Sequence, residues 1–147
     1  MVQLYEKYYH LGLEILAFPS NEFGKDEPGT NAYIKSFAAQ ETKKFGSPLA
    51  RQFPVFAKST TNKRCGQPAS KGCRPQSTEC CSKNDGIYRY LQAKLPGKVN
   101  WNYNKYLISR TGAVLKHYKP HHHGMHKDLV KDIEAALKQG ATGGSGH

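Results

Sequence analysis

Helical and extended apolar segments alternate along this chain, and that alternation limits the fold more than any other feature. The apolar residues among the first eleven recur at helical spacing, and Gly12 offers a left-handed end to that helix. A short apolar run over 13–18 then predicts a buried strand that ends at Pro19. The first half is therefore expected to contain a helix to residue 11, a strand at 13–18, a helix opened by Thr30 or Asn31 that carries Ile34, Phe37 and Ala38, and a strand at 53–58.

The second half continues the same pattern. A helix capped by Asn84 or Asp85 is expected to stop at Pro96-Gly97. The remaining expected elements are a hairpin of strands 105–109 and 113–118, a helix over about 126–138 with Leu129, Val130, Ile133 and Leu137 as its apolar stripe, an end at Gly140, and a flexible Gly-rich tail at 141–147. This order predicts a single α/β domain over residues 1–140.

Residues 59–83 interrupt the pattern with a Gly-, Pro-, Ser-, Lys- and Cys-rich stretch that has no periodicity. A stretch of this length is expected to be an insertion loop, either functional or mobile. All four cysteines, Cys65, Cys73, Cys80 and Cys81, lie in it, which is unlike a secreted disulfide framework. Reduced loop thiols, a local disulfide and a zinc site are the three alternatives for them.

The net charge of +11 and pI of about 9.6 favour an acidic partner, such as RNA, an acidic protein surface or an anionic membrane surface. Much of the excess lies within residues 63–98, although a dispersed solvated surface is the alternative. No apolar run approaches the ~20 residues that span a bilayer, so membrane insertion is not expected. The opening residues show no secretory leader pattern, and we expect an intracellular protein of the cytosol or mitochondrion.

Residues 18–31 (FPSNEFGKDEPGTN) and 101–107 (WNYNKYL), in this order, resemble two signature segments of the glutathione peroxidase family. The resemblance extends from Leu4 to about Leu137, apart from the insertion. It implies a thioredoxin-like α/β fold. It also implies reduction of peroxides by a cysteine or selenocysteine that precedes the first segment, with glutathione or thioredoxin as reductant and no other cofactor.

The resemblance also implies three site positions: Glu22, where the family has a catalytic Gln, together with Trp101 and Asn102. An ionised Glu22 cannot donate a hydrogen bond to a thiolate, and its charge would raise the thiol pKa. We therefore treat the three as vestigial catalytic positions. Trp101 and Asn102 have a structural alternative, because a large indole buries well and an Asn can satisfy nearby backbone groups. Cys65-Gly66 echoes the active-site Cys-Gly of the family but stands at the wrong place in the order.

The chain is expected to begin after the central strand and peroxidatic turn of that fold. The missing strand would leave two open edges, between the strand at 13–18 and the strand at 105–109. A partner chain or a second copy could donate a strand, or the native chain could be longer. Alternatively, the two edges pair with each other and the sheet narrows.

A cluster of five histidines, His117, His121, His122, His123 and His126, precedes the last helix. Dense imidazoles can bind zinc, nickel or copper, but no carboxylate or thiol stands at set spacing beside them. A solvated turn is the favoured alternative.

The sequence supports three function hypotheses. The first is a non-catalytic family member that serves as a structural subunit of a large assembly with an acidic partner. The second is a glutathione- or thioredoxin-dependent peroxidase of which this chain is an incomplete portion. The third is direct RNA binding, which rests on charge alone.

Overall fold

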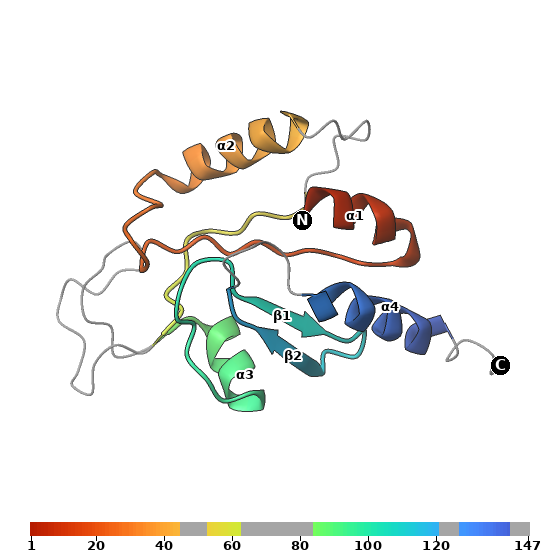
Figure 1. Cartoon of the computed structure of the whole chain (residues 1–147). Coiled ribbons are helices and arrows are strands. Elements are labelled where there is room, and N and C mark those ends of the chain that lie inside the picture. The colour runs from red at the N-terminus through yellow and green to blue at the C-terminus, as the bar shows by residue number, and fades with distance from the viewer. Residues whose placement is uncertain (45–52, 63–83, 121–126, 142–147) are drawn as a thin grey trace.

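The structure is a computed structural model that describes residues 1–44, 53–62, 84–120 and 127–141 (Figure 1). Its regular elements are α1 (Val2–Tyr8), η1 (Tyr9–Leu11), α2 (Asn31–Lys44), α3 (Gly86–Lys94), β1 (Lys105–Ile108), β2 (Val114–Tyr118) and α4 (Lys127–Ala141). Among these helices, none combines the length and the apolar character that crossing a bilayer requires.

Strands β1 and β2 form the predicted antiparallel hairpin, in which Lys105 pairs with Tyr118 and Leu107 pairs with Lys116. The register shifts between Leu107 and Ile108. The turn closes where the Ser109 amide donates to the Ala113 carbonyl at 2.8 Å and Gly112 takes a φ of 87°. The hairpin prediction is confirmed, because both strands and their turn lie where the apolar pattern put them.

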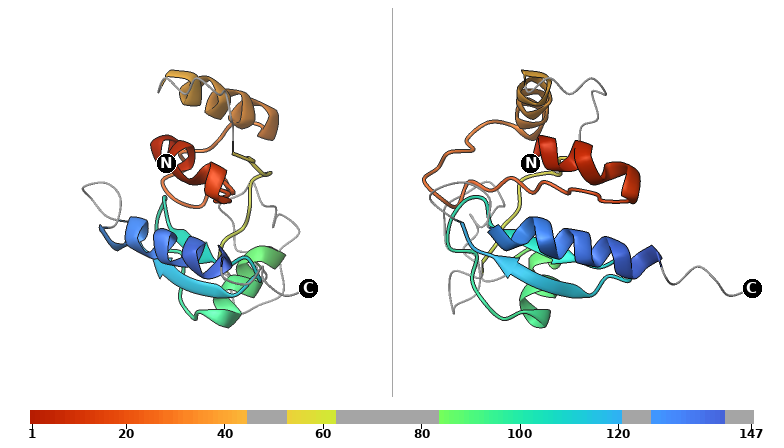
Figure 2. Two further views of the ribbon diagram at one scale, coloured as in Figure 1. Left: turned by 90° about the vertical axis from the view of Figure 1, so that its right-hand side faces the viewer. Right: turned by 45° about the vertical axis from the view of Figure 1, so that its right-hand side comes forward.

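Two core clusters cover opposite faces of this hairpin. Leu4 and Tyr8 of α1 pack with Tyr118 of β2 and with Leu129 and Ile133 of α4. On the other face, the second cluster joins Tyr88 and Leu91 of α3 to Val99, with Tyr106 packed against it. Figure 2 shows the resulting layers, with α1 and α4 on one side of the hairpin and α3 on the other. The predicted stripe of α4 is confirmed.

The predicted strands at 13–18 and 53–58 are wrong as regular strands. Both segments are extended, but they share only one parallel bridge, between Ala17 and Val55. The Ala17 amide donates to the Pro54 carbonyl at 2.9 Å, and the Phe56 amide donates to the Ala17 carbonyl at 2.9 Å. Pro19 and Pro54 have no amide hydrogen to contribute, which stops the ladder from extending.

The extended segment 13–18 also does not pair with β1. Among the backbone hydrogen bonds of the described residues, none joins these two segments. The alternative in which the two edges pair with each other is therefore wrong. Leu13 and Leu107 instead each pack on the α1–α4 core.

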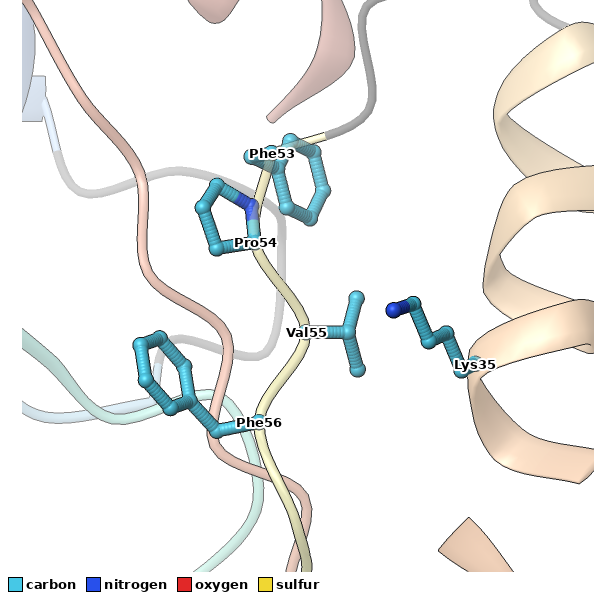
Figure 3. Close-up of a pocket in the computed structure, with 5 residues that line it drawn as sticks. All are labelled: Lys35, Phe53, Pro54, Val55 and Phe56. Carbon is cyan, nitrogen blue, oxygen red and sulfur yellow. The ribbon is translucent and has the colours of Figure 1, made fainter. Parts of the chain in front are cut away.

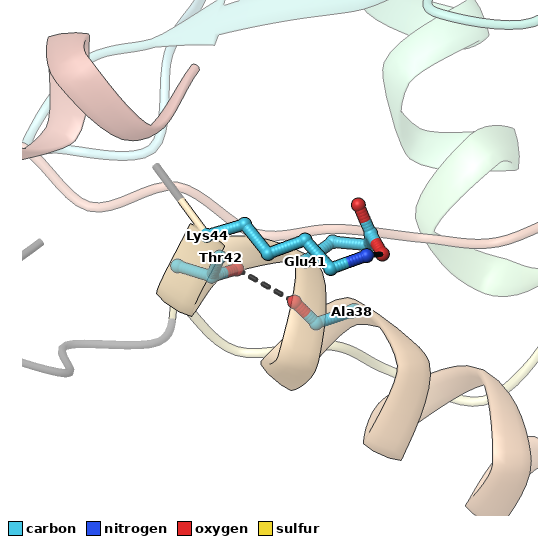
Figure 4. Close-up of polar contacts among 4 residues, drawn as sticks. All are labelled: Ala38, Glu41, Thr42 and Lys44. Carbon is cyan, nitrogen blue, oxygen red and sulfur yellow. Dashed lines mark hydrogen bonds and ion pairs between the residues drawn. The ribbon is translucent and has the colours of Figure 1, made fainter. Parts of the chain in front are cut away.

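Helix α2 begins where the sequence indicated, because the Thr30 hydroxyl accepts from the Tyr33 amide at 3.2 Å. Its predicted apolar stripe is only partly right: Ile34 is buried, whereas Phe37 is half exposed. Figures 1 and 2 show α2 outside the layers that enclose the hairpin, so it has little surface against which to bury that stripe. Its last turn is stabilised locally, by the Thr42 hydroxyl donating to the Ala38 carbonyl and by a Lys44–Glu41 ion pair (Figure 4).

The sequence predicts that Gly12 and Gly140 each end a helix. Gly12 has a φ of 95° and ends η1 as predicted. Gly140 does not end α4, which runs on to Ala141, so the predicted end and the start of the tail at residue 141 are wrong. A glycine within a helix costs only about 1 kcal/mol relative to alanine, which is too little to stop it alone.

Two carboxylates of α4 make the fold sensitive to acid. Asp132 accepts from the Lys116 ammonium at 2.7 Å and from the Tyr118 hydroxyl, and these bonds lower its pKa. The pKa of Glu134 is lowered in the same way, mainly by a hydrogen bond from the Tyr8 hydroxyl and to a smaller extent by the charge of Lys7. Depressed folded-state pKa values stabilise the fold above the unfolded values near pH 4, and that stability is lost as pH falls through the folded values.

We therefore expect the free energy of unfolding to fall below about pH 4, with a shallower fall in Asp132→Asn. Urea unfolding followed at several pH values between neutral and strongly acidic checks this. Glu14→Gln is the matched control, because Glu14 is exposed and its carboxylate accepts from the adjacent Ile15 amide. An acid profile of Asp132→Asn that superimposes on that of the wild type would contradict the expectation.

Candidate functional site

The first signature segment folds into a compact loop. Glu22 donates its amide to the Ser20 hydroxyl at 3.3 Å, and the Asn21 side chain accepts from the Glu27 amide at 3.0 Å. Gly24 and Lys25 both have positive φ, 65° and 58°, so the chain reverses sharply between these contacts. Left-handed backbone at a residue with a side chain is uncommon and is often found where a loop has a function.

A buried lysine fixes this loop against the rest of the chain. Lys58 is 6% exposed, and its ammonium donates to the carbonyls of Glu27 and Gly29 at 3.1 and 2.6 Å. Its amide donates to the Asn31 side chain at 3.0 Å. This role was not predictable from the sequence, because a lone lysine at the end of an apolar run carries no signal that its charge will be buried.

The second signature segment forms a tight turn before β1. Tyr103 has a φ of 62°, and the Asn104 amide group bridges the turn by donating to the Trp101 carbonyl at 2.6 Å. The Trp101 side chain is 53% exposed and that of Tyr103 is 81% exposed. The interpretation that burial alone explains Trp101 is therefore wrong, since the turn directs the indole toward solvent.

The two signature segments meet at this turn. Asn102 donates its amide group to the Asp26 carboxylate at 3.0 Å, and the rings of Phe23 and Trp101 lie 6.2 Å apart between centroids. Asn102 thus binds a carboxylate rather than the backbone group that the structural alternative required. The two segments, far apart in sequence, therefore form one surface on which the Trp101 indole lies beside the Asn102 amide that Asp26 orients.

Glu22 lies on the inner side of the same loop. Its carboxylate accepts from the hydroxyl of buried Thr61. It also contributes to the raised pKa of Tyr88, for which burial is the larger cause and the nearby Tyr106 the next. The position that the resemblance aligned with a catalytic Gln is thus tied to the core of the domain beneath α3.

A polar cluster, made up of Thr61, Asn62, Asn84 and Gln92, adjoins Glu22. The Asn62 side chain donates to the Val99 carbonyl at 2.6 Å and accepts from the Val99 amide at 3.0 Å. The Asn84 and Gln92 side chains bond to each other at 2.8 Å, and both donate to the Thr61 carbonyl. Asn84 was expected only as a helix cap, and no local sequence signal indicated the other three.

Several predicted features lie outside the described residues: the four cysteines, residues 63–83, and the histidines at 121–123 and 126. Within the described ranges, no group of three or more His, Cys, Asp or Glu side chains is arranged to hold a metal ion. A separate pocket of about 250 Å³ lies between Lys35 of α2 and residues 53–56 (Figure 3). Figure 3 shows the Lys35 side chain directed at Val55, with no residue of either signature segment in the lining.

Comparison with known proteins identifies a family and several relatives of this chain. The sequence profile of the family described as "Glutathione peroxidase" matches residues 1–70. A "Probable phospholipid hydroperoxide glutathione peroxidase" of Citrus sinensis is 33% identical over 140 residues, covering 91% of this chain and 69% of that protein.

Two further relatives are similar over most of this chain. The "Phospholipid hydroperoxide glutathione peroxidase" of Bos taurus is 37% identical over 139 residues, which cover 93% of this chain and 58% of that protein. The "Putative glutathione peroxidase 7, chloroplastic" of Arabidopsis thaliana is 35% identical over 122 residues, which cover 80% and 42% respectively. On this similarity, the chain belongs to the glutathione peroxidase family, which has a thioredoxin-like α/β fold.

Proposed function

We propose that this chain contributes the Trp101–Asn102 half of a thiol-dependent hydroperoxide reductase site. The observation that carries the proposal is the half-exposed indole of Trp101 beside an Asn102 amide held by Asp26. Packing alone would bury such an indole, whereas a site for an approaching sulfur or selenium atom needs it at the surface. Indole and amide N–H groups are donors, and donors stabilise a thiolate.

The proposed reaction is the reduction of a hydroperoxide, in keeping with the names of the relatives. The chalcogen anion attacks the terminal peroxide oxygen, the O–O bond breaks, and the alkoxide leaves with a proton as an alcohol. Two thiols of glutathione or thioredoxin class then return the oxidised chalcogen to its starting state and leave as a disulfide, with water as the second product. The attacking group must reach Trp101 from a segment other than those that the structure describes.

A non-catalytic subunit is the second candidate, and Glu22 favours it. An acceptor-only carboxylate held by Thr61 replaces a donor amide, and its negative charge opposes a thiolate. In this candidate the unpaired edges of segment 13–18 and of β1 accept a strand from a partner or a second copy. The basic region 63–98 would then face an acidic protein or RNA, in the cytosol or a mitochondrion.

Hydroperoxide consumption by the full chain, with glutathione and with a thioredoxin system, tests the enzyme proposal. The thiols of this chain all lie at positions 65, 73, 80 and 81, so turnover by the chain alone requires one of them to supply the attacking group. We expect turnover above the uncatalysed rate, at least about tenfold faster in Glu22→Gln because the opposing charge is removed, and at least about tenfold slower in Trp101→Phe. Tyr33→Phe, an exposed aromatic on α2, is the matched control and should behave as wild type.

No consumption by either the wild type or Glu22→Gln would overturn the enzyme proposal. The non-catalytic candidate predicts that outcome, together with co-sedimentation of the chain with a particle that releases it at high salt. If the chain remains monomeric at low salt, that result would contradict the non-catalytic subunit.

A further inference from the structure

Of the five clustered histidines, His117 is the one that lies within the described residues. It lies on β2, directly across from Tyr106 of β1, and the two rings stack at 4.1 Å between centroids with planes 5° apart. Its Nε2 lies 2.8 Å from the Asn104 side-chain oxygen. The ring is half-buried, so both its stacking face and its edge are engaged by residues at the base of the Trp101 turn.

The bonding of Asn104 determines which nitrogen of His117 carries the proton. The Asn104 amide nitrogen donates to the Trp101 carbonyl at 2.6 Å and to the Asn100 side chain at 3.4 Å. Its oxygen is therefore left to accept, and His117 must donate to it through Nε2–H. Two consecutive hydrogen bonds therefore connect the His117 ring, through the Asn104 amide, to the Trp101 carbonyl in the turn.

Two other polar contacts hold the turn: Asn102 donates to the Asp26 carboxylate at 3.0 Å, and the Lys105 ammonium donates to the Tyr103 carbonyl at 2.8 Å. Tyr103 adopts left-handed backbone, a strained conformation that a bulky residue keeps only where its surroundings enforce it. Trp101 is 53% exposed and Tyr103 is 81% exposed, so packing of these two side chains restrains the turn only in part. The Asn104 amide is the contact that closes the turn, from residue 104 back to the Trp101 carbonyl at 2.6 Å.

We propose that His117 and Asn104 form a positioning pair that fixes the 101–104 turn and so sets the orientation of Trp101 and Asn102. Its catalytic meaning rests on the proposed function, because what it orients is the indole and amide of that site. The pair acts on the reaction only through the turn and touches no reacting atom.

The surroundings of the ring agree with a neutral donor. Tyr106 faces it from β1, and the uncharged Asn104 and Gly97 face it from the segment between α3 and β1. Lys119 lies just beyond β2, and burial together with this positive charge lowers the pKa of His117. The ring is thus uncharged at neutral pH, with Nε2–H available to Asn104.

The single tryptophan of the chain gives a direct test that needs no substrate. Acrylamide quenching of Trp101 fluorescence is measured in His117→Phe, which keeps the stacked ring but loses the donor, and in His117→Gln, which keeps an amide donor. Asn104→Ala removes the bridge itself. His10→Phe is the matched control, because His10 is exposed on η1.

We expect Asn104→Ala and His117→Phe to raise the quenching constant. The ceiling is about twofold, because the indole is already 53% exposed. His117→Gln and His10→Phe should stay near wild type, and the Asn104→Ala, His117→Phe double variant should match the single variants. Wild-type quenching in His117→Phe, equal effects of His117→Phe and His117→Gln, or additive effects in the double variant would each overturn the pair.

Circular dichroism establishes that each variant is folded. If His117→Phe does not fold, Asn104→Asp takes its place: it retains an acceptor for His117 but loses the donor to the Trp101 carbonyl. Quenching should then rise, and an unchanged value would overturn the pair. Absence of peroxide turnover leaves the fluorescence result standing, so failure of the proposed function and failure of the pair are separate outcomes.

Discussion

Ile133→Ala is expected to lower the free energy of unfolding by about 3 to 4 kcal/mol. Ile133 is 4% exposed and packs with Leu4 and Tyr8 of α1, with Tyr118 of β2, and with Leu129 one turn earlier on α4. Truncation removes buried methyl and methylene groups and leaves a cavity between three elements that cannot all collapse into it. In a chain of this size the midpoint of thermal unfolding should fall by roughly 10 °C.

Ile108→Ala provides the matched control for this substitution. Ile108 is the same residue type at the end of β1, but it is 39% exposed. Its truncation should cost about 1 kcal/mol or less, because less apolar area leaves water there. Chemical denaturation of both variants measures the difference, and equal losses would mean that the α1–β2–α4 cluster is not the main core.

Asn62→Ala is expected to cost about 3 kcal/mol, an unusually large loss for a polar side chain. Asn62 pairs with both the amide and the carbonyl of Val99, which is 5% exposed, and also accepts from Gln92 at 3.2 Å. Alanine leaves two buried backbone groups without partners, and each incurs the cost of losing water without a replacement bond.

The matched control for Asn62 is Asn100→Ala. Asn100 is exposed and makes one long contact, at 3.4 Å, with Asn104. Its loss should stay within about 0.5 kcal/mol. Urea unfolding of the two variants decides the matter: a small effect at Asn62 would show that water replaces its bonds and that Val99 is less enclosed than its burial indicates.

The helices and the hairpin were predictable because local signals determine them. Thr30, Gly12 and the apolar stripe of α4 each act within a few residues, so the sequence alone indicates where those elements lie. The segments at 13–18 and 53–58 failed as strands for the opposite reason. A strand forms only by pairing with neighbouring strands, and the prolines at 19 and 54 limit the pairing that a short apolar run predicts.

The candidate site was predictable in its members but not in its arrangement. The resemblance identified Trp101 and Asn102, yet exposure of the indole depends on the left-handed backbone at Tyr103, for which Tyr is a poor signal. The contacts of Asn102 with Asp26 and of Glu22 with Thr61 join residues far apart in the chain. Without covariation between such positions, no local rule predicts which polar groups will meet.

The polar cluster of Thr61, Asn62, Asn84 and Gln92 has a practical consequence for engineering. Asn62 and Asn84, the residues that flank positions 63–83, are both held by Gln92, so the two ends of that stretch are already brought together. The entropic penalty for lengthening a stretch closed in this way grows only with the logarithm of its length, about 0.6 kcal/mol per doubling. An epitope or a fluorescent label inserted between Asn62 and Asn84 should therefore leave the fold intact, which makes this stretch a suitable place to attach a reporter.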